Sequence, residues 1–161
     1  MKKFLTLLLA AVMTLSLAAC GSKADDNTGG DQPASALDLL NAVWAKYSDD
    51  DKFPVMGGGT DENNMVENAP GSFSVEDGDA LDYSLSFPAA DADKLSDAAS
   101  LIHMMNANTF TAGAFHVASS SDVDTVVSDL KDNVMSRQWM CGFPDKLVIL
   151  TLGDYVVSCY G

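Results

Sequence analysis

Two apolar segments near the C-terminus, separated by a glycine and an aspartate, constrain the fold more than any other part of the chain. Lys146 to Leu152 and Tyr155 to Tyr160 are both rich in β-branched or aromatic residues, and Gly153-Asp154 lies between them. A two-residue loop with glycine first is typical of a type II′ turn, which joins antiparallel strands. We therefore expect a closing β-hairpin in which Leu152 pairs with Tyr155, and a sheet that is at least partly antiparallel.

Three segments repeat apolar residues every three or four positions, which predicts helices. The first should begin at Ser35, because Ser35 and Asp38 have the spacing of a capping box. Its apolar stripe, expected to face the core, is formed by Leu40, Val43, Trp44 and Tyr47. The second helix is expected over residues 89–105, and the third after Ser121, which should cap it.

Two further segments, residues 81–87 and 109–118, alternate between apolar and polar residues, which predicts half-buried strands. Residues 53–78 have no regular period, and we expect loops there. With the hairpin, this order predicts one α+β domain over residues 35–161. Its expected architecture is a two-layer sandwich of a largely antiparallel sheet with helices on one face, closed by the C-terminal β-hairpin.

Residues 1–19 have the pattern of a signal peptide. Lys2 and Lys3 precede an apolar stretch that is too short for a stable transmembrane helix. The segment that ends the stretch, Leu17-Ala18-Ala19-Cys20, resembles a bacterial lipobox. That resemblance implies attachment of a lipid to the Cys20 sulfur and cleavage before this residue. A secreted protein with a chance cysteine is the alternative.

A lipid on Cys20 would hold the protein at the extracytoplasmic face of a bacterial cell membrane. Each buried CH₂ of an acyl chain such as palmitate contributes ~0.8 kcal/mol, so two or more chains form a stable anchor. Residues 20–34 have no apolar period and cannot bury enough surface to order themselves. We expect them to form the lipidated cysteine and a flexible tether.

The charge and the cysteines limit the possible partners and crosslinks. The formal net charge of −14 argues against nucleic acid and against anionic lipid headgroups as partners. Besides Cys20, the chain has Cys141 and Cys159. The predicted hairpin places Cys159 opposite Val148, well away from Cys141. We therefore expect these two thiols not to be bonded to each other.

No residue pattern predicts a catalytic or metal site. His103 and His116 lie on different expected elements, with no third ligand at a matching spacing, which disfavours a copper site. Cys141 has no neighbouring base in the sequence that would activate it as a nucleophile. The acidic residues of segment 76–82 lack the spacing of a calcium loop. We expect no cofactor and no enzymatic activity, with an enzyme as the least favoured alternative.

One expected loop gathers large apolar residues. Trp139, Met140 and Phe143 lie within five positions of one another, between the third helix and the hairpin. Loops are usually polar because they meet water. This loop is therefore either packed into the core or offered to a partner, since interfaces are enriched in Trp, Phe and Met. Both alternatives stay open, and the three residues form a candidate partner surface.

The C-terminal part of the chain is similar to a known group of proteins. The similarity rests on Met104-Met105-Asn106, the strand and valine-rich helix that follow, and Gly153-Asp154-Tyr155-Val156-Val157. It resembles small lipoproteins of gut anaerobic Gram-positive bacteria, labelled as a domain of unknown function or as bacteriocin-transport accessory proteins. The resemblance implies no catalytic residues. We expect a membrane-anchored, non-enzymatic module that binds a protein, a peptide or an envelope component, with a small-ligand carrier as the alternative.

Overall fold

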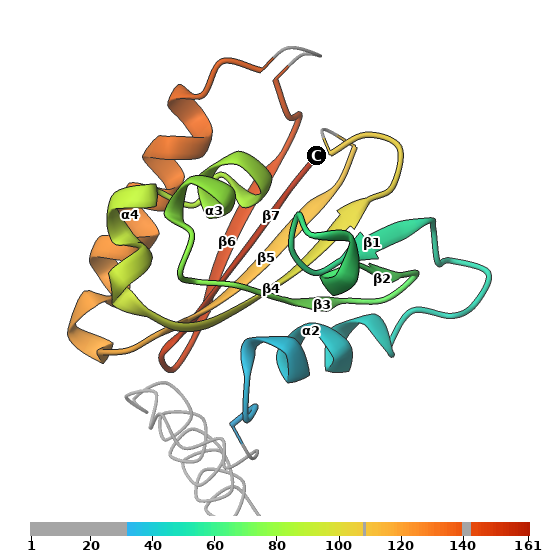
Figure 1. Ribbon diagram of the computed structural model, residues 1–161, viewed down its shortest axis with the longest axis horizontal. Coiled ribbons are helices and arrows are strands. Elements are labelled where there is room, and N and C mark those ends of the chain that lie inside the picture. The colour runs from blue at the N-terminus through green and yellow to red at the C-terminus, as the bar shows by residue number, and fades with distance from the viewer. Residues whose placement is uncertain (1–31, 108, 140–142) are drawn as a thin grey trace, which may run out of the picture. The chain divides into compact units, whose positions relative to one another are not determined.

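A seven-stranded antiparallel sheet organises the computed structural model, which describes residues 32–107, 109–139 and 143–161 (Figure 1). The strand order is β2-β1-β4-β5-β7-β6, and β3 also pairs with β4. The strands are β1 (Val55–Gly57), β2 (Val66–Glu67), β3 (Gly71–Phe73), β4 (Leu95–His103), β5 (Thr111–Val117), β6 (Leu147–Leu152) and β7 (Tyr155–Tyr160). The helices are α2 (Ala36–Trp44), α3 (Gly78–Leu85) and α4 (Val123–Ser136), with short 3₁₀ turns at η1 (Glu62–Asn64), η2 (Ala89–Lys94) and η3 (Ser120–Asp122).

The predicted α+β class, with an antiparallel sheet and a closing β-hairpin, is confirmed. Leu152 pairs with Tyr155 and Val148 pairs with Cys159, as the turn at Gly153-Asp154 predicts. Gly153 has a φ of +57°, which favours glycine over other residues.

The helices divide between the two faces of the sheet. α3 and α4 pack on the face that carries Ala98, Phe115 and Val156, and their shared core includes Leu81, Leu130 and Val134. α2 packs on the opposite face, over Ala99, Leu101, Ala112 and Ala114. The sheet is therefore covered on both sides, where helices on one face were expected. Alternating residues of β4 and β5 belong to different cores, because successive side chains of a strand point to opposite faces.

The strand expected at residues 81–87 is wrong, because the segment is helical as α3. Asp77 begins the helix, since its carboxylate accepts a 3.0 Å hydrogen bond from the Ala80 N–H. Leu81 and Leu85 are both fully buried, and they are four residues apart, as one helix face requires. Tyr83 is 78% exposed, whereas a strand would have buried it beside them.

The helix expected over residues 89–105 is also wrong, because only Ala89–Lys94 forms a short 3₁₀ turn and Leu95–His103 is the central strand β4. Four consecutive residues of β4, Ala98 to Leu101, are buried. A strand covered on both faces loses the alternation of apolar and polar residues that identifies a half-buried strand. Its alanines instead give the segment a composition that is typical of a helix.

The region expected to be loops, residues 53–78, contains β1, β2 and β3. The backbones of β1 and β3 approach so closely that a Cβ on Gly57 would lie 2.2 Å from the Gly71 nitrogen. The Ser100 hydroxyl joins them to β4, since it accepts from the Gly58 N–H and donates to the Gly58 carbonyl, both at 2.8 Å. Gly57 and Gly71 thus lie in strands because their backbones pack closely, and a pattern of apolar residues cannot reveal such packing.

The two predicted helix caps have different outcomes. Ser35 caps α2, because its hydroxyl accepts a 3.1 Å hydrogen bond from the Asp38 N–H, as predicted. Ser121 does not cap α4, which begins after Asp122 without a side-chain cap. The Ser121 hydroxyl instead lies 2.8 Å from that of Ser119. No helix in the described ranges is long and apolar enough to cross a membrane.

Candidate functional site

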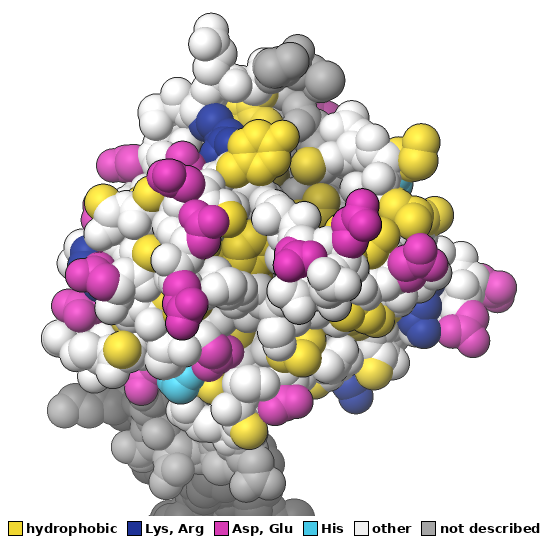
Figure 2. Space-filling model, in the orientation of Figure 1, with side chains coloured by type: hydrophobic (Ala, Val, Ile, Leu, Met, Phe, Trp, Pro, Cys, Tyr) yellow, Lys and Arg dark blue, Asp and Glu magenta, His cyan; other side chains and the backbone are white. Residues whose placement is uncertain are grey.

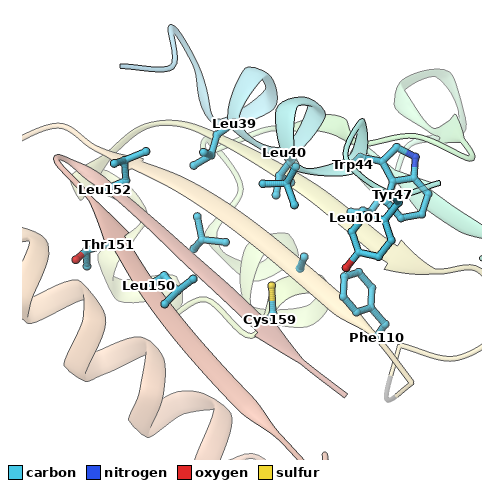
Figure 3. A pocket seen from close by; sticks show the side chains of 13 residues that line it. Leu39, Leu40, Trp44, Tyr47, Leu101, Phe110, Leu150, Thr151, Leu152 and Cys159 are labelled. Carbon is cyan, nitrogen blue, oxygen red and sulfur yellow. The ribbon is translucent and has the colours of Figure 1, made fainter. Parts of the chain in front are cut away.

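An apolar groove lies between α2 and the C-terminal hairpin (Figure 3). α2 lies over β4 and β5, and the neighbouring strands β7 and β6 extend beyond it. The resulting hollow has a volume of about 310 Å³. Its walls are formed by Leu39, Leu40, Val43, Trp44 and Tyr47 on one side, and by Leu101, Phe110, Ala112, Leu150, Thr151, Leu152, Val157 and Cys159 on the other.

The groove exposes side chains that a fully covered sheet would bury. Leu150 and Leu152 of β6 line the groove and are 61% and 48% exposed, and Val148 on the same face of the strand is 49% exposed. On the helix, Val43 is 52% exposed, although it belongs to the stripe predicted to face the core. Figure 3 shows Leu39 and Leu40 pointing from the helix toward the strands, and Leu150 pointing from the hairpin into the same space. Contiguous exposed apolar patches are characteristic of surfaces that contact ligands or partners.

Packing holds α2 in place as one wall of the groove. Leu40 and Trp44 are buried against the small residues of β4 and β5. The Trp44 indole N–H donates to the Asn68 carbonyl at 3.1 Å, so its polar end is already satisfied. The ring of Trp44 also contacts Tyr47 and Phe53, at centroid distances of 5.3 and 5.6 Å. The wall is thus formed before any ligand arrives.

Cys159 contributes a thiol to the lining of the groove. It lies on β7 as a free, half-buried thiol, and Figure 3 shows its sulfur turned toward the helix. Burial raises the pKa of the thiol, so the thiolate is less populated at neutral pH and the group is a weak nucleophile. Cys141 lies outside the described residues, and the absence of a bond between the two cysteines stays a prediction.

The loop predicted as a partner surface is only partly described, because Met140 lies outside the described residues. Trp139 is half-buried against the core beneath α4, and its indole N–H donates to the Val134 carbonyl at 3.2 Å. Its ring meets that of Tyr160 at 5.3 Å. Phe143 is 50% exposed. Trp139 is therefore packed against the core, whereas Phe143 is half exposed to solvent.

The two histidines have separate partners. His103 pairs with Val55 at one end of β4, and its Nδ1 accepts from the Met105 N–H at 3.2 Å. His116 lies across from Asp97 at the other end, with Nδ1 at 3.0 Å from the Asp97 carboxylate. Among the residues that the structure describes, no three His, Cys, Asp or Glu side chains gather closely enough to bind a metal ion.

A buried carboxylate lies apart from the groove. Asp91 is only 6% exposed and forms an ion pair with Lys94 of the same 3₁₀ turn. The pKa of Asp129 on α4 is raised, chiefly by loss of solvation around its carboxyl and then by the nearby Asp91 carboxylate. The Lys94 ammonium lies near both carboxylates and offsets their charge.

The groove could not be located from the sequence, because its lining comes from segments far apart in the chain. One signal was present in β6, where five of the six residues are apolar and only Thr151 is polar. An edge strand that is apolar on both faces indicates that something covers each face. No family model, curated protein or solved structure matches this chain.

Proposed function

We propose that this protein is a lipid-anchored binding module at the extracytoplasmic face of a bacterial membrane, and that the groove beside α2 binds an apolar part of a protein, peptide or envelope component. The single observation that carries the proposal is the preformed groove of about 310 Å³ with almost wholly apolar walls. Pockets that bind ligands are usually concave, apolar and formed in advance, with volumes of roughly 300–1,000 Å³.

The chemistry of the walls supports binding over catalysis. Among the described residues of the lining, those whose side chains carry a polar atom are Tyr47, Thr151, Cys159 and Trp44. The Trp44 group is already donated to Asn68, and the Cys159 pKa is raised by burial. A general base needs a titratable group within reach of its substrate, and the described residues that line the groove include no carboxylate or imidazole.

The anchor belongs to the same proposal. Cys20 lies outside the described residues, and the support for its lipidation is the Leu17–Cys20 motif after an apolar stretch. The motif resemblance of the C-terminal sequence to small Gram-positive lipoproteins favours the same location. An anchored domain meets its ligand at the membrane surface, where proteins, peptides and lipids with apolar parts are concentrated.

The test is a titration with an apolar fluorescent dye, N-phenyl-1-naphthylamine, followed by energy transfer from tryptophan. The chain from Gly21 onward is used, since both hydrophobic cores lie within the compact unit Gln32–Gly161. The chain has two tryptophans, so Trp139→Phe leaves Trp44 in the groove as the donor. We expect saturable binding at one site.

A matched pair of variants locates the dye. Val43→Arg places a charge in the groove, whereas Met135→Arg places the same charge on α4, and the two native side chains are 52% and 51% exposed. We expect Val43→Arg to weaken binding by about tenfold or more, equivalent to ~1.4 kcal/mol, and Met135→Arg to leave it unchanged. Equal binding by the two variants, or no saturable binding, would contradict the proposal.

A further inference from the structure

We infer that the occupant of the groove is an extended, cationic polypeptide segment that adds a strand to the free edge of β6; this inference rests on the proposed function of the groove. The edge supplies backbone hydrogen-bonding groups in a regular row, and the groove beside it supplies an apolar surface. An extended peptide satisfies both, whereas a small apolar molecule satisfies only the groove.

The hydrogen-bond register identifies the groups that face outward. β6 is the last strand in the sheet order, with β7 as its neighbour on one side. Lys146 and Gly161 exchange two backbone hydrogen bonds of 3.0 and 3.1 Å across the end of this pair. Because antiparallel strands bond at alternate residues, Leu147, Ile149 and Thr151 direct their N–H and C=O groups to the outer edge. No other described strand pairs with that edge.

The edge lacks the features that usually prevent strand addition. Natural edge strands are interrupted by charged residues, proline or bulges, or are very short. β6 has six residues, Leu147 to Leu152, none of them charged or proline, and its register with β7 is unbroken. The opposite edge of the sheet is β2, which has only two residues and includes Glu67. The contrast between the two edges of the sheet indicates that the β6 edge is suited to accept a further strand.

The side chains beside the edge define the pattern of the added strand. Directly opposed residues of antiparallel strands point to the same face. Peptide residues opposite Val148 and Leu150 would therefore extend the apolar surface on the groove side, with their own amides turned away from β6. Peptide residues opposite Ile149 would place their amides toward β6. Apolar residues are thus expected at alternate positions of the peptide.

Charge argues for a cationic peptide and against a second copy of this chain. The three lysines and three acidic residues among residues 1–31 cancel, so the formal charge of −14 lies entirely within residues 32–161. Figure 2 shows acidic side chains spread over the face that carries α3 and α4. Asp145 and Asp154 flank the two ends of β6, with Lys146 as the only basic residue between them. Two such domains repel each other, whereas a basic peptide is attracted.

The experiment uses a labelled nine-residue peptide and measures its binding by fluorescence anisotropy. The peptide has lysine at positions 1 and 9, valine at positions 3, 5 and 7, and threonine at the four even positions. Two methylated forms provide the comparison. Methyl groups on the threonine amides block the bonds to β6 when the valines face the groove, whereas methyl groups on the valine amides point away. We expect the first form to bind about tenfold more weakly than the parent and the second to bind like the parent. Equal affinities for the two forms would overturn the inference.

Variants at the edge of β6 test strand addition independently of the methylated peptides. Thr151→Pro removes one outward N–H and leaves the bonds to β7 in place, while Thr151→Val removes the hydroxyl alone. We expect the proline variant to bind the peptide more weakly than the valine variant, and equal binding by the two folded variants would contradict the inference. If Thr151→Pro does not fold, the methylated peptides decide the outcome by themselves.

Two further results separate this inference from the proposed function. A peptide with glutamates at its ends should bind more weakly at low salt, and equal binding would refute the cationic partner. Sedimentation of the domain should show a monomer, and a stable dimer that excludes the peptide would assign the edge to a second copy. If the dye binds the groove but no peptide does, this inference alone fails; if the dye does not bind, the proposed function fails as well.

Discussion

The Asp97 carboxylate accepts a 2.7 Å hydrogen bond from the Ala36 N–H, the first residue of α2. Its other oxygen lies 3.0 Å from His116 Nδ1. The His116 ring stacks on Tyr155 at 4.3 Å, and the Tyr155 hydroxyl donates to the Pro33 carbonyl at 2.8 Å. This network fixes the start of the helix to three strands of the sheet, and so positions one wall of the groove.

Removal of the Asp97 carboxylate should loosen that wall. We expect Asp97→Ala to lower the free energy of unfolding by about 1–3 kcal/mol, because it leaves a helix N-terminal N–H and His116 without their partner. Urea denaturation of the chain from Gly21 onward measures the change. The control is Asp93→Ala, which removes an exposed carboxylate. Equal midpoints for the two variants would show that the contact does not hold α2.

Trp139 should behave as a core residue. We expect Trp139→Ala to cost about 3 kcal/mol of stability, because the ring packs on Tyr160 and its N–H is bonded to Val134. Phe143→Ala should cost less than about 1 kcal/mol, since that ring is half exposed. Thermal unfolding of both variants measures the difference. A Trp139→Ala protein that melts like the parent would return Trp139 to the candidate partner surface.

The hairpin and the start of α2 could be predicted from the sequence because each depends on local chemistry. The turn needs only Gly153-Asp154, and the cap needs only Ser35 and its near neighbours. Segment 81–87 fits two periods at once, since Leu81 and Leu85 share a helix face while every second residue is apolar. Only packing against α4 decides between a helix and a strand for this segment. Next to α4, Arg137 donates a 2.6 Å hydrogen bond to the Asp82 carbonyl near the end of α3.

The strand β4 and the groove could not be predicted, because both depend on long-range contacts. Ala98 to Leu101 are buried on both faces of the sheet, so no alternation identifies a strand there. The stripe predicted for α2 was right only for Leu40 and Trp44, because Tyr47 lies beyond the end of the helix and the cover over Val43 depends on where β6 and β7 lie. For this reason Leu40 and Trp44 are buried, while Val43 remains exposed.

The Cys159 thiol should react slowly and should be protected by a ligand. With Cys141→Ser in the chain from Gly21 onward, Cys159 is the only cysteine. Burial raises its pKa, so at pH 8 a smaller fraction is thiolate than in a free thiol, and the rate should rise only at higher pH. Iodoacetamide labelling followed by mass spectrometry measures the rate with and without the dye. Labelling as fast as a free cysteine, or unaffected by saturating dye, would place the thiol outside the site.

Lipid attachment should depend on Cys20. We expect the Cys20→Ala protein to leave the membrane fraction, whereas Cys141→Ala should remain there. Metabolic labelling with an acyl-chain analogue, read by gel fluorescence, checks the modification directly. If the Cys20→Ala protein stays in the membrane fraction and the wild type takes up no label, the anchor is refuted.

The central claim is that the groove beside α2 is the binding site, and methyl NMR tests it most directly. The chain from Gly21 onward, with labelled leucine and valine methyl groups, is titrated with the apolar dye. We predict shift changes at Leu39, Val43 and Leu150 in the groove, and none at Leu130 on the buried face of α4. Changes confined to the other face of the sheet, near Trp139 and Phe143, would contradict the account and move the site to that loop.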